Sequence, residues 1–226
     1  MGPPSPTLEE PDPITLAPIE PVDDGEEDDT YQQVLSTYSN SRIYTVLPYT
    51  ELGSQEEFHD PSHLLSLAER LKEVVAAQGP VHIDEAFRDV ARCWAFNTLG
   101  RKIKRQLTHA LAHINATERP IKRGDVWLWP TDLDPATWQE FRIPGDEARS
   151  FRKAEHIAPE EFAIASRAIL KRAIGSMRRE DLARATAHLF GIRRMGPRVR
   201  EHVGLGVALI IDSGEAVLRG DEVTLV

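Results

Sequence analysis

Apolar residues of the chain recur at helical spacing in three consecutive segments of its first half. The first segment is bounded by Asp60-Pro61, a pair typical of a helix start, and by Gly79-Pro80, a pair that stops helices. The second segment begins near Asp84, and we predict three short helices. Their inward positions are Leu64, Leu67, Ala68, Leu71, Val74 and Val75, then Ala86, Phe87, Val90, Ala91 and Trp94, then Leu99, Ile103, Leu107, Ala110, Leu111 and Ile114.

A β-hairpin is predicted after the third helix, from Ile121 to Trp129. Residues alternate there around a tight turn at 123–125, where Gly124 tolerates a positive φ, and Pro130 closes the hairpin. Three short helices followed by a hairpin is the layout of a winged helix, a relative of the helix-turn-helix.

The second half of the chain repeats the first half at a spacing of 96 residues, without a gap. A core pattern, a turn glycine and a hairpin turn all share this register, so we predict two copies of one unit. The matching positions include Trp94 with Phe190, Leu99-Gly100 with Met195-Gly196, Leu107 with Val203, Leu111 with Val207, and Arg123-Gly124-Asp125 with Arg219-Gly220-Asp221.

These patterns predict an α+β fold, mainly helical with small β-hairpins, built from two tandem winged-helix units. The expected organisation is an acidic, Pro-rich, disordered leader over residues 1–30, a partly ordered lead-in over 31–59, unit one over 60–130, a linker over 131–157 and unit two over 158–226.

Charge is distributed unevenly along the chain. The formal net charge is -9, but residues 1–30 hold ten of the 36 acidic residues, seven of the 16 prolines and no Lys or Arg. The remaining 26 acidic and 27 basic residues leave the rest of the chain nearly neutral, so any basic patch must be local. The leader is expected to act as a linker or solubilising segment, and the alternative is an acidic competitor for a basic groove.

The composition favours a soluble, cytoplasmic protein. Cys93 is the only cysteine, which excludes an internal disulfide framework. No apolar run approaches the roughly 20 residues of a membrane helix, and the N-terminus opens with proline and acid where a signal peptide has a basic patch.

The third helix of unit one carries the strongest candidate site. Arg101 and Arg105 lie opposite its apolar face, with Lys102 and Lys104 beside them. Four cations within five residues on an exposed face are typical of a helix that follows phosphates. The alternative is a solvated face that only keeps the domain soluble. The full set of predicted nucleic-acid-binding residues is Arg101, Lys102, Lys104, Arg105, Thr108, His109, Lys122 and Arg123.

Unit two is a weaker candidate, because Pro197 and Glu201 occupy the positions equivalent to Arg101 and Arg105. A carboxylate at the centre of the face opposes phosphate, which favours a packing or protein-contact role. The weaker candidate residues are Arg193, Arg194, Arg198, Arg200 and Arg219.

Other residue patterns predict no catalytic, metal or cofactor site. The pairs His59/His63 and His109/His113 have helical metal-ligand spacing, but no third ligand accompanies either pair. Cys93 is interpreted as a buried apolar side chain, with a reactive thiol as the alternative. Trp127 and Trp129 are expected to pack on the helices, with stacking on an unpaired base as the alternative.

Five stretches of the sequence together resemble a known family. They are Gly-Pro-Val-His at 79–82, Trp94 with Gly-Arg-Lys-Ile at 100–103, Trp-Leu-Trp-Pro at 127–130, Ile-Ala-Pro-Glu-Glu at 157–161 and Gly-Ile-Arg-Arg-Met-Gly-Pro-Arg-Val-Arg at 191–200. They resemble the uncharacterised bacterial domain that closes large superfamily-one DNA helicases fused to a restriction-endonuclease-like nuclease, and the resemblance covers about residues 43–226. In that family the ATP-binding motifs and nuclease carboxylates lie upstream. This chain has no phosphate-binding Gly-Lys-Ser/Thr loop and no nuclease core, so the resemblance does not imply either activity.

Two functions remain open at this point. The first is a non-catalytic module that binds duplex or forked DNA as an accessory to a helicase–nuclease. The second is a protein-interaction module that docks a helicase or nuclease partner, or dimerises, without contacting nucleic acid. No enzyme activity, cofactor, small-molecule ligand or membrane contact is expected.

Overall fold

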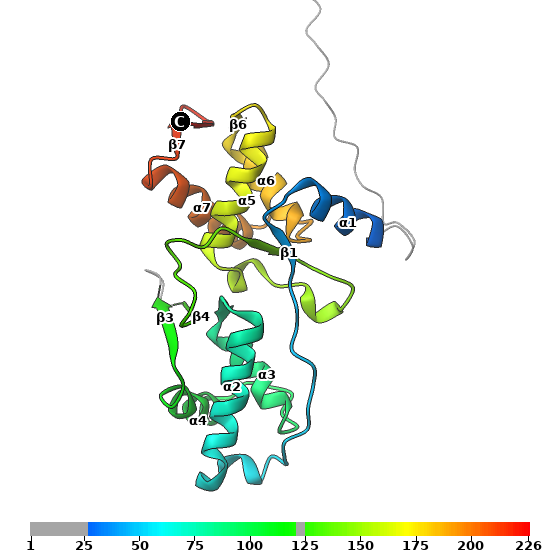
Figure 1. Ribbon diagram of the computed structural model, residues 1–226, viewed down its shortest axis with the longest axis vertical. Coiled ribbons are helices and arrows are strands. Elements are labelled where there is room, and N and C mark those ends of the chain that lie inside the picture. Colours follow the sequence, from blue (N-terminus) through cyan, green and yellow to red (C-terminus); the bar gives the residue numbers. More distant parts are fainter. Residues whose placement is uncertain (1–26, 121–124) are drawn as a thin grey trace, which may run out of the picture.

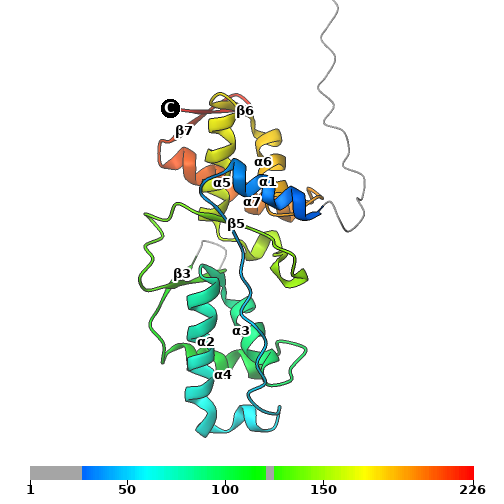
Figure 2. The same ribbon diagram turned by 45° about the vertical axis from the view of Figure 1, so that its right-hand side comes forward.

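The computed structural model describes the backbone of residues 27–120 and 125–226, and within these ranges the chain is a mixed α/β protein with small sheets. The predicted α+β class is confirmed. Two units are stacked along the long axis of the molecule (Figure 1, Figure 2). Residues 1–26 of the predicted leader lie outside the described residues.

Unit one packs three helices around an apolar core and against a small antiparallel sheet. Trp94 and Leu107, both fully buried, lie in this core at inward positions of the helical pattern. The elements are the 3-10 turns Glu57–His59 and Pro61–His63, α2 (Leu64–Gln78), β2 (Val81–His82), α3 (Ile83–Arg92), α4 (Arg101–Leu111), β3 (Ala116–Pro120) and β4 (Val126–Pro130), with sheet order β2-β4-β3.

Unit two has the same order of elements and the same sheet topology. Helices α5 and α7 pack against each other, with Phe162 and Val203 fully buried in its core. The elements are α5 (Pro159–Arg172), β6 (Ser176–Arg178), α6 (Arg179–Leu189), α7 (Pro197–Asp212), β7 (Ala216–Arg219) and β8 (Glu222–Leu225), with sheet order β6-β8-β7.

The 96-residue register of the sequence recurs in the structure. A shift of 96 residues brings α2, β2, α3, α4 and β4 onto α5, β6, α6, α7 and β8. The strands β3 and β7 depart from this register. Helix α7 extends to Asp212, whereas the end of α4 at Leu111 corresponds to Val207, so the second hairpin starts later and is shorter.

The turn between the second and third helices has the same backbone geometry in both units. Ala95 has a φ of 60°, and its equivalent Gly191 has a φ of 72°. The N–H of Phe96 donates to the carbonyl of Ala91 at 3.1 Å, and Ile192 makes the equivalent 3.0 Å bond in unit two. A hydrogen bond of this kind closes the C-terminal end of a helix when the residue after the last turn has the left-handed conformation. The conformation suits glycine and costs another L-residue roughly 1–2 kcal/mol.

Replacing Ala95 with glycine is therefore expected to raise the free energy of unfolding by about 1 kcal/mol, because the Cβ strain outweighs the extra entropy of the unfolded glycine. Gly191→Ala is expected to lower the free energy of unfolding by more than this. Its added Cβ would lie 3.0 Å from Pro144 and 3.1 Å from Phe151. Urea denaturation measures both effects, and a destabilised Ala95→Gly protein would contradict the assignment of strain to this turn.

The segment before unit one packs against unit two. It contains a helix that the sequence pattern did not predict, α1 (Glu27–Thr37), and the strand β1 (Ser41–Ile43). Tyr31 and Leu35 of α1 pack against the core around Phe162. Figure 2 shows the chain then running along the molecule to the far end of unit one. The lead-in therefore ties the two units together.

The predicted linker also forms part of the folded structure. It contains β5 (Phe141–Ile143), which pairs in parallel with β1 between the two units, and the 3-10 turns Ala148–Ser150 and Ala154–His156. The ring of Trp138 packs edge-on against Trp129 of unit one, with 5.8 Å between ring centroids. The segment therefore packs against both units, Trp138 against Trp129 and Phe141 within the core around Phe162.

A buried ion cluster joins the units through β5. Glu161, in the first turn of α5, is fully buried. Its carboxylate accepts hydrogen bonds from Arg142 Nη2 at 2.7 Å and from Arg152 Nη1 at 2.6 Å. Arg142 also donates to the carbonyls of residues 78–80, at the C-terminal end of α2, at 2.6 to 2.9 Å. The guanidinium of Arg152 lies 4.2 Å from the ring of Tyr44. One linker arginine thus connects the end of α2 to the start of α5.

The protonation state of this cluster follows from its charges. Burial by itself raises the pKa of Glu161, but the nearby guanidinium groups of Arg142 and Arg152 attract and hydrogen-bond the carboxylate, and they lower its pKa to about 2. Glu161 is therefore ionised at neutral pH.

Candidate nucleic-acid interface

Helix α4 presents its basic residues to solvent. Ile103 and Leu107 lie in the core, as the period of 3.6 residues requires. Arg101, Lys102 and Arg105 project from the other face and are exposed. Thr108 and His109 are exposed further along the helix.

Two of the predicted contact residues on α4 have partners within the protein. Lys104 Nζ lies 2.7 Å from Asp84 Oδ1 in the first turn of α3, which neutralises its charge. Thr108 Oγ1 donates to the carbonyl of Lys104 at 2.8 Å. Among the side chains described, those of residues 31–118 and 125–226, Arg101 and Arg105 have no ion-pair partner. The free cations on this face therefore come from the first turn and a half of α4.

The position of these cations on the helix is electrostatically unfavourable. Gly100 at the N-cap makes no side-chain capping bond, and the first turn contains no acidic residue. A cation near a helix N-terminus faces the positive end of the dipole and costs about 0.3–1 kcal/mol. Asp84 offsets this cost for Lys104, but no described carboxylate does so for Arg101 or Lys102. The stability of α4 therefore gives no reason for cations at positions 101 and 102.

Unit two does not reproduce this face. Pro197 and Glu201 stand at the positions of Arg101 and Arg105, and both are exposed. Glu201 has an interaction within the protein.

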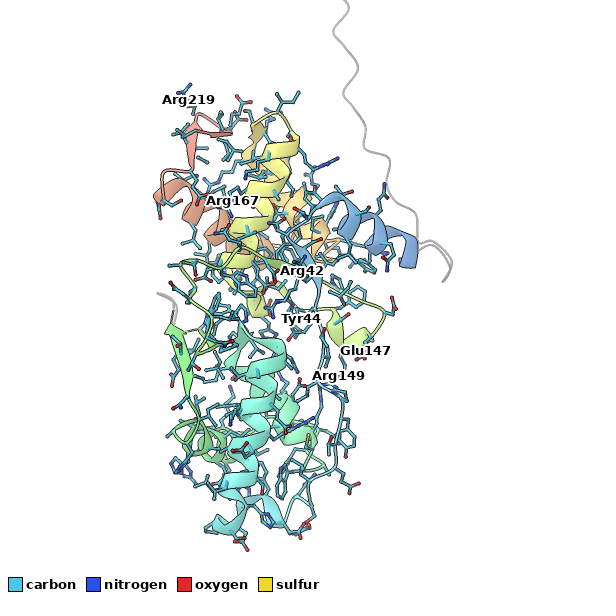
Figure 3. All side chains as sticks on the ribbon, in the orientation of Figure 1. Arg42, Tyr44, Glu147, Arg149, Arg167 and Arg219 are labelled. Atoms are coloured by element: carbon cyan, nitrogen blue, oxygen red, sulfur yellow. The ribbon has the colours of Figure 1, made fainter. Side chains whose placement is uncertain are left out.

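The other basic candidates of unit two are scattered. Arg198 is 83% exposed and lies 3.9 Å from Glu155, and Arg200 lies 3.6 Å from Glu180. Arg193 also has a partner in the protein, and Arg194 is exposed. Figure 3 places Arg219 at the end of the molecule distant from unit one. The structure does not gather these arginines into one patch with α4.

The structure does not test whether the predicted hairpin-turn residues of unit one extend the basic face of α4. Lys122 and Arg123 lie outside the described residues. The strands β3 and β4 are described up to Pro120 and from Val126.

The remaining candidate residues are largely accounted for by packing. Trp127 and Trp129 are buried to 1% and 0% exposure, so neither ring is available to stack on a base. Cys93 is 1% exposed, and its Sγ lies 3.4 Å from the carbonyl of Asp89. His63 packs edge-on against Trp94, with 5.0 Å between ring centroids. No group of three or more metal-ligating side chains occurs in the described part of the chain.

Sequence reasoning missed a second group of charged residues. Arg149 and Lys153 from the predicted linker face Arg88 and Arg92 of α3 across a cleft. The signal available in the sequence was the run of four cations in 142–153, namely Arg142, Arg149, Arg152 and Lys153. The sequence does not reveal the role of these four cations, because that role depends on where the fold places residues 142–153.

Comparison with known proteins adds one match. A family model described as "Protein of unknown function (DUF3320)" matches residues 56–105, which run from the turn before α2 into the first half of α4. No curated protein and no solved structure matches the chain. Within the described residues, none of the helices combines the length and apolar character needed to cross a membrane.

Proposed function

We propose that this chain is a non-catalytic nucleic-acid-binding module of two winged-helix units, in which α4 of unit one lies against duplex or forked DNA. The observation that carries the proposal is the exposure of Arg101, Lys102 and Arg105 on one helix face, without carboxylate partners among the described residues. Cations placed in this way attract phosphates and release counterions on binding.

The order of elements supports the winged-helix assignment. Each unit has a helix, a short strand, two further helices and two strands that complete a three-stranded sheet. In helix-turn-helix proteins the second helix of the motif lies in the major groove and its N-terminal residues contact the DNA. Helix α4 is the equivalent helix here, and its cations lie at its N-terminal end.

The proposed context is a helicase–nuclease system. The support for an accessory role is the resemblance of the sequence to the domain that closes such proteins. Unit two, with Glu201 on the equivalent face, is proposed to contact protein instead of DNA.

Fluorescence anisotropy with a labelled 20-base-pair duplex and a forked substrate tests the proposal. The double variant Arg101→Glu, Arg105→Glu is expected to lose at least about a hundredfold in affinity at low salt. The slope of log K against log salt is expected to fall by about 2, since each phosphate contact contributes about 0.9.

A charge-matched control is available in unit two. The double variant Arg194→Glu, Arg198→Glu changes the net charge equally and is expected to alter the affinity by less than about threefold. Equal losses from the two double variants would reject α4 as the contact surface. No binding by the unmodified chain at low salt, together with co-purification of a helicase or nuclease, would favour the protein-interaction function.

A further inference from the structure

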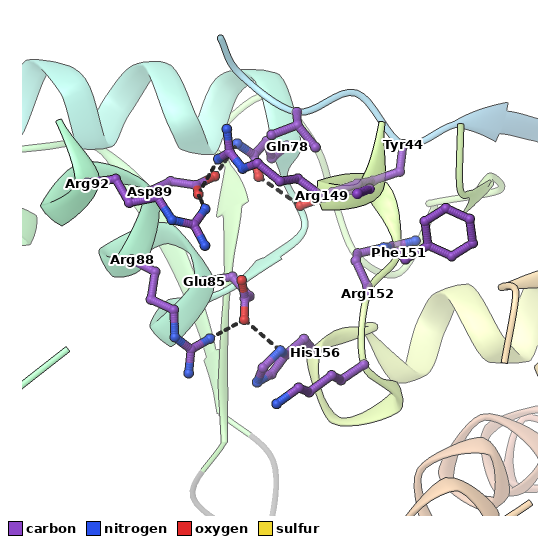
Figure 4. A pocket seen from close by; sticks show the side chains of 13 residues that line it. Tyr44, Gln78, Glu85, Arg88, Asp89, Arg92, Arg149, Phe151, Arg152 and His156 are labelled. Atoms are coloured by element: carbon purple, nitrogen blue, oxygen red, sulfur yellow. Dashed lines mark hydrogen bonds and ion pairs between the residues drawn. The ribbon is translucent and has the colours of Figure 1, made fainter. Parts of the chain in front are cut away.

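A cleft of about 410 Å³ lies between unit one and the segment that precedes unit two (Figure 4). We call it the inter-unit cleft. One wall is the face of α3 that carries Arg88 and Arg92, and the other wall is formed by residues 148–156. Tyr44, from the stretch after β1, also lines it. None of its described lining residues comes from α4.

The charge of the inter-unit cleft is positive. Five cations line it against two lining carboxylates, Glu85 and Asp89, and one of the five, Arg152, is paired with the buried Glu161 outside the lining. Arg92 Nη1 and Arg149 Nη2 share a single oxygen of Asp89, at 2.8 and 2.5 Å. Lys153 is exposed and has no ion-pair contact with the side chains described over residues 31–118 and 125–226, although its charge helps to lower the pKa of the nearby Glu155. Pairing within the protein therefore leaves uncompensated positive charge at the cleft.

The ion pairs also hold the guanidinium groups in place. Arg88 pairs with Glu85, whose Oε1 also lies 2.7 Å from His156 Nδ1. The other oxygen of Asp89 accepts from Gln78 Nε2 at 2.8 Å. A guanidinium has five N–H donors, so one bond to a carboxylate leaves donors for an oxyanion. The side chains of Arg88, Arg92 and Arg149 are about one-third exposed or more, so these donors are accessible from solvent.

An aromatic side chain lies at the edge of the inter-unit cleft. Phe151 lines the inter-unit cleft and is 43% exposed, although its neighbours in sequence are polar. Its ring contacts Tyr31 edge-on, with 6.2 Å between centroids. In Figure 4 this ring points away from Arg88 and Arg92, so the charged side chains of the inter-unit cleft, and not the ring, carry the recognition of a ligand.

We propose that the inter-unit cleft binds a phosphate monoester, carried either by a free nucleotide or by the 5′ end of a nucleic acid strand. A monoester bears about two negative charges at neutral pH, whereas each internal phosphodiester bears one. The excess of cations therefore favours a terminal phosphate. The site is independent of α4, and the sequence pattern did not predict it.

Isothermal titration calorimetry of the full chain at pH 8 tests the proposal, with AMP, inorganic phosphate and adenosine as probes. AMP is expected to bind, and adenosine is expected to bind at least about tenfold more weakly, because it lacks the charged group. A 5′-phosphorylated pentanucleotide and its 5′-hydroxyl form distinguish the two sources. Tighter binding of the phosphorylated strand than of AMP identifies a strand end, and the reverse identifies a free nucleotide.

The matched variants are Lys153→Glu and Lys171→Glu. Both lysines are exposed, but Lys171 lies on α5 outside the inter-unit cleft. Lys153→Glu is expected to weaken AMP binding at least about tenfold, and Lys171→Glu less than about twofold. Arg149→Met keeps an apolar stem and serves as a second cleft variant if Lys153→Glu does not fold.

Several outcomes would overturn the proposal. They are the absence of heat with AMP and inorganic phosphate at millimolar concentration, equal affinity for adenosine and AMP, and equal effects of the two lysine variants. The double variant Arg101→Glu, Arg105→Glu is expected to bind AMP as the unmodified chain does. The inter-unit cleft can therefore bind a phosphate monoester even if α4 does not bind nucleic acid.

Discussion

Glu161→Gln is expected to lower the free energy of unfolding by about 3–5 kcal/mol. The substitution keeps the shape of the side chain but removes the negative charge between two guanidinium groups. Arg142 and Arg152 have side chains only 8% and 6% exposed, so water cannot replace the carboxylate. Arg142 would then keep only uncharged hydrogen-bond acceptors, such as the carbonyls of Gln78 and Pro80, and its charge would be left without a counterion. Chemical denaturation followed by tryptophan fluorescence measures the loss.

The pH dependence of stability provides an internal check on this expectation. The pKa of Glu161 is about 2 in the folded protein, below its ordinary value of 4.5. The carboxylate therefore contributes its stabilisation fully above pH 4.5, and the contribution is lost as the pH falls through 2. The shift corresponds to about 3 kcal/mol. The difference between the unmodified and Glu161→Gln proteins is expected to shrink over this pH range.

An exposed ion pair in the same segment is the control. Glu140 lies 2.8 Å from Arg42, and the two side chains are 36% and 54% exposed. Glu140→Gln is expected to change the free energy of unfolding by less than about 1 kcal/mol, because water screens the pair. A loss from Glu161→Gln no larger than that from Glu140→Gln would show that the buried cluster does not hold the two units together.

The second large effect is expected from Gly206→Val, which should lower the free energy of unfolding by about 3 kcal/mol. Gly206 lies on α7 where it crosses α5. A Cβ at this position would lie 2.4 Å from Phe162 Cβ and 2.7 Å from the backbone nitrogen of Ala163. Backbone atoms cannot move aside cheaply, so the two helices would have to separate. Thermal denaturation followed by circular dichroism measures the change.

Gly204 on the same helix provides the matched control. A Cβ at Gly204 meets no described atom within 4 Å. Gly204→Ala is expected to raise the free energy of unfolding by about 0.5–1 kcal/mol, because alanine favours the helix. Stabilisation by both substitutions would mean that α5 and α7 are not packed as closely as the structure has them.

Much of the helical framework could be predicted from local pattern. The inward positions Leu67, Leu71 and Val74 recur every three or four residues, and the fold buries them as that spacing requires. The turn at Ala95 is a partial exception. Its equivalent Gly191 signals a left-handed turn, but alanine does not, and only the 96-residue register relates the two positions.

The candidate face on α4 was partly predictable for the same reason. Helical geometry alone places Arg101 and Arg105 opposite Ile103 and Leu107. The pairing of Lys104 with Asp84 was not predictable, because the two residues are 20 positions apart and meet only when α3 and α4 pack.

Segments with weak local signals were the least predictable. Helix α1 is short, and its apolar residues are partly buried by packing against the core of unit two. Glu161 lies in the first turn of α5, where a carboxylate suits the helix dipole. The tertiary structure also buries it between two arginines from the segment interpreted as a linker, which no local signal indicates.

The sequence by itself determined the repeat, the order of helices in each unit and the side of α4 that carries charge, because these depend on spacing between near neighbours in the chain. Tertiary structure alone decided which cations are neutralised, which segments join the units and where the inter-unit cleft lies. These features depend on distances between residues tens of positions apart, such as Gln78 with Arg142 or Asp89 with Arg149. The folded backbone sets those distances, and no local periodicity encodes them.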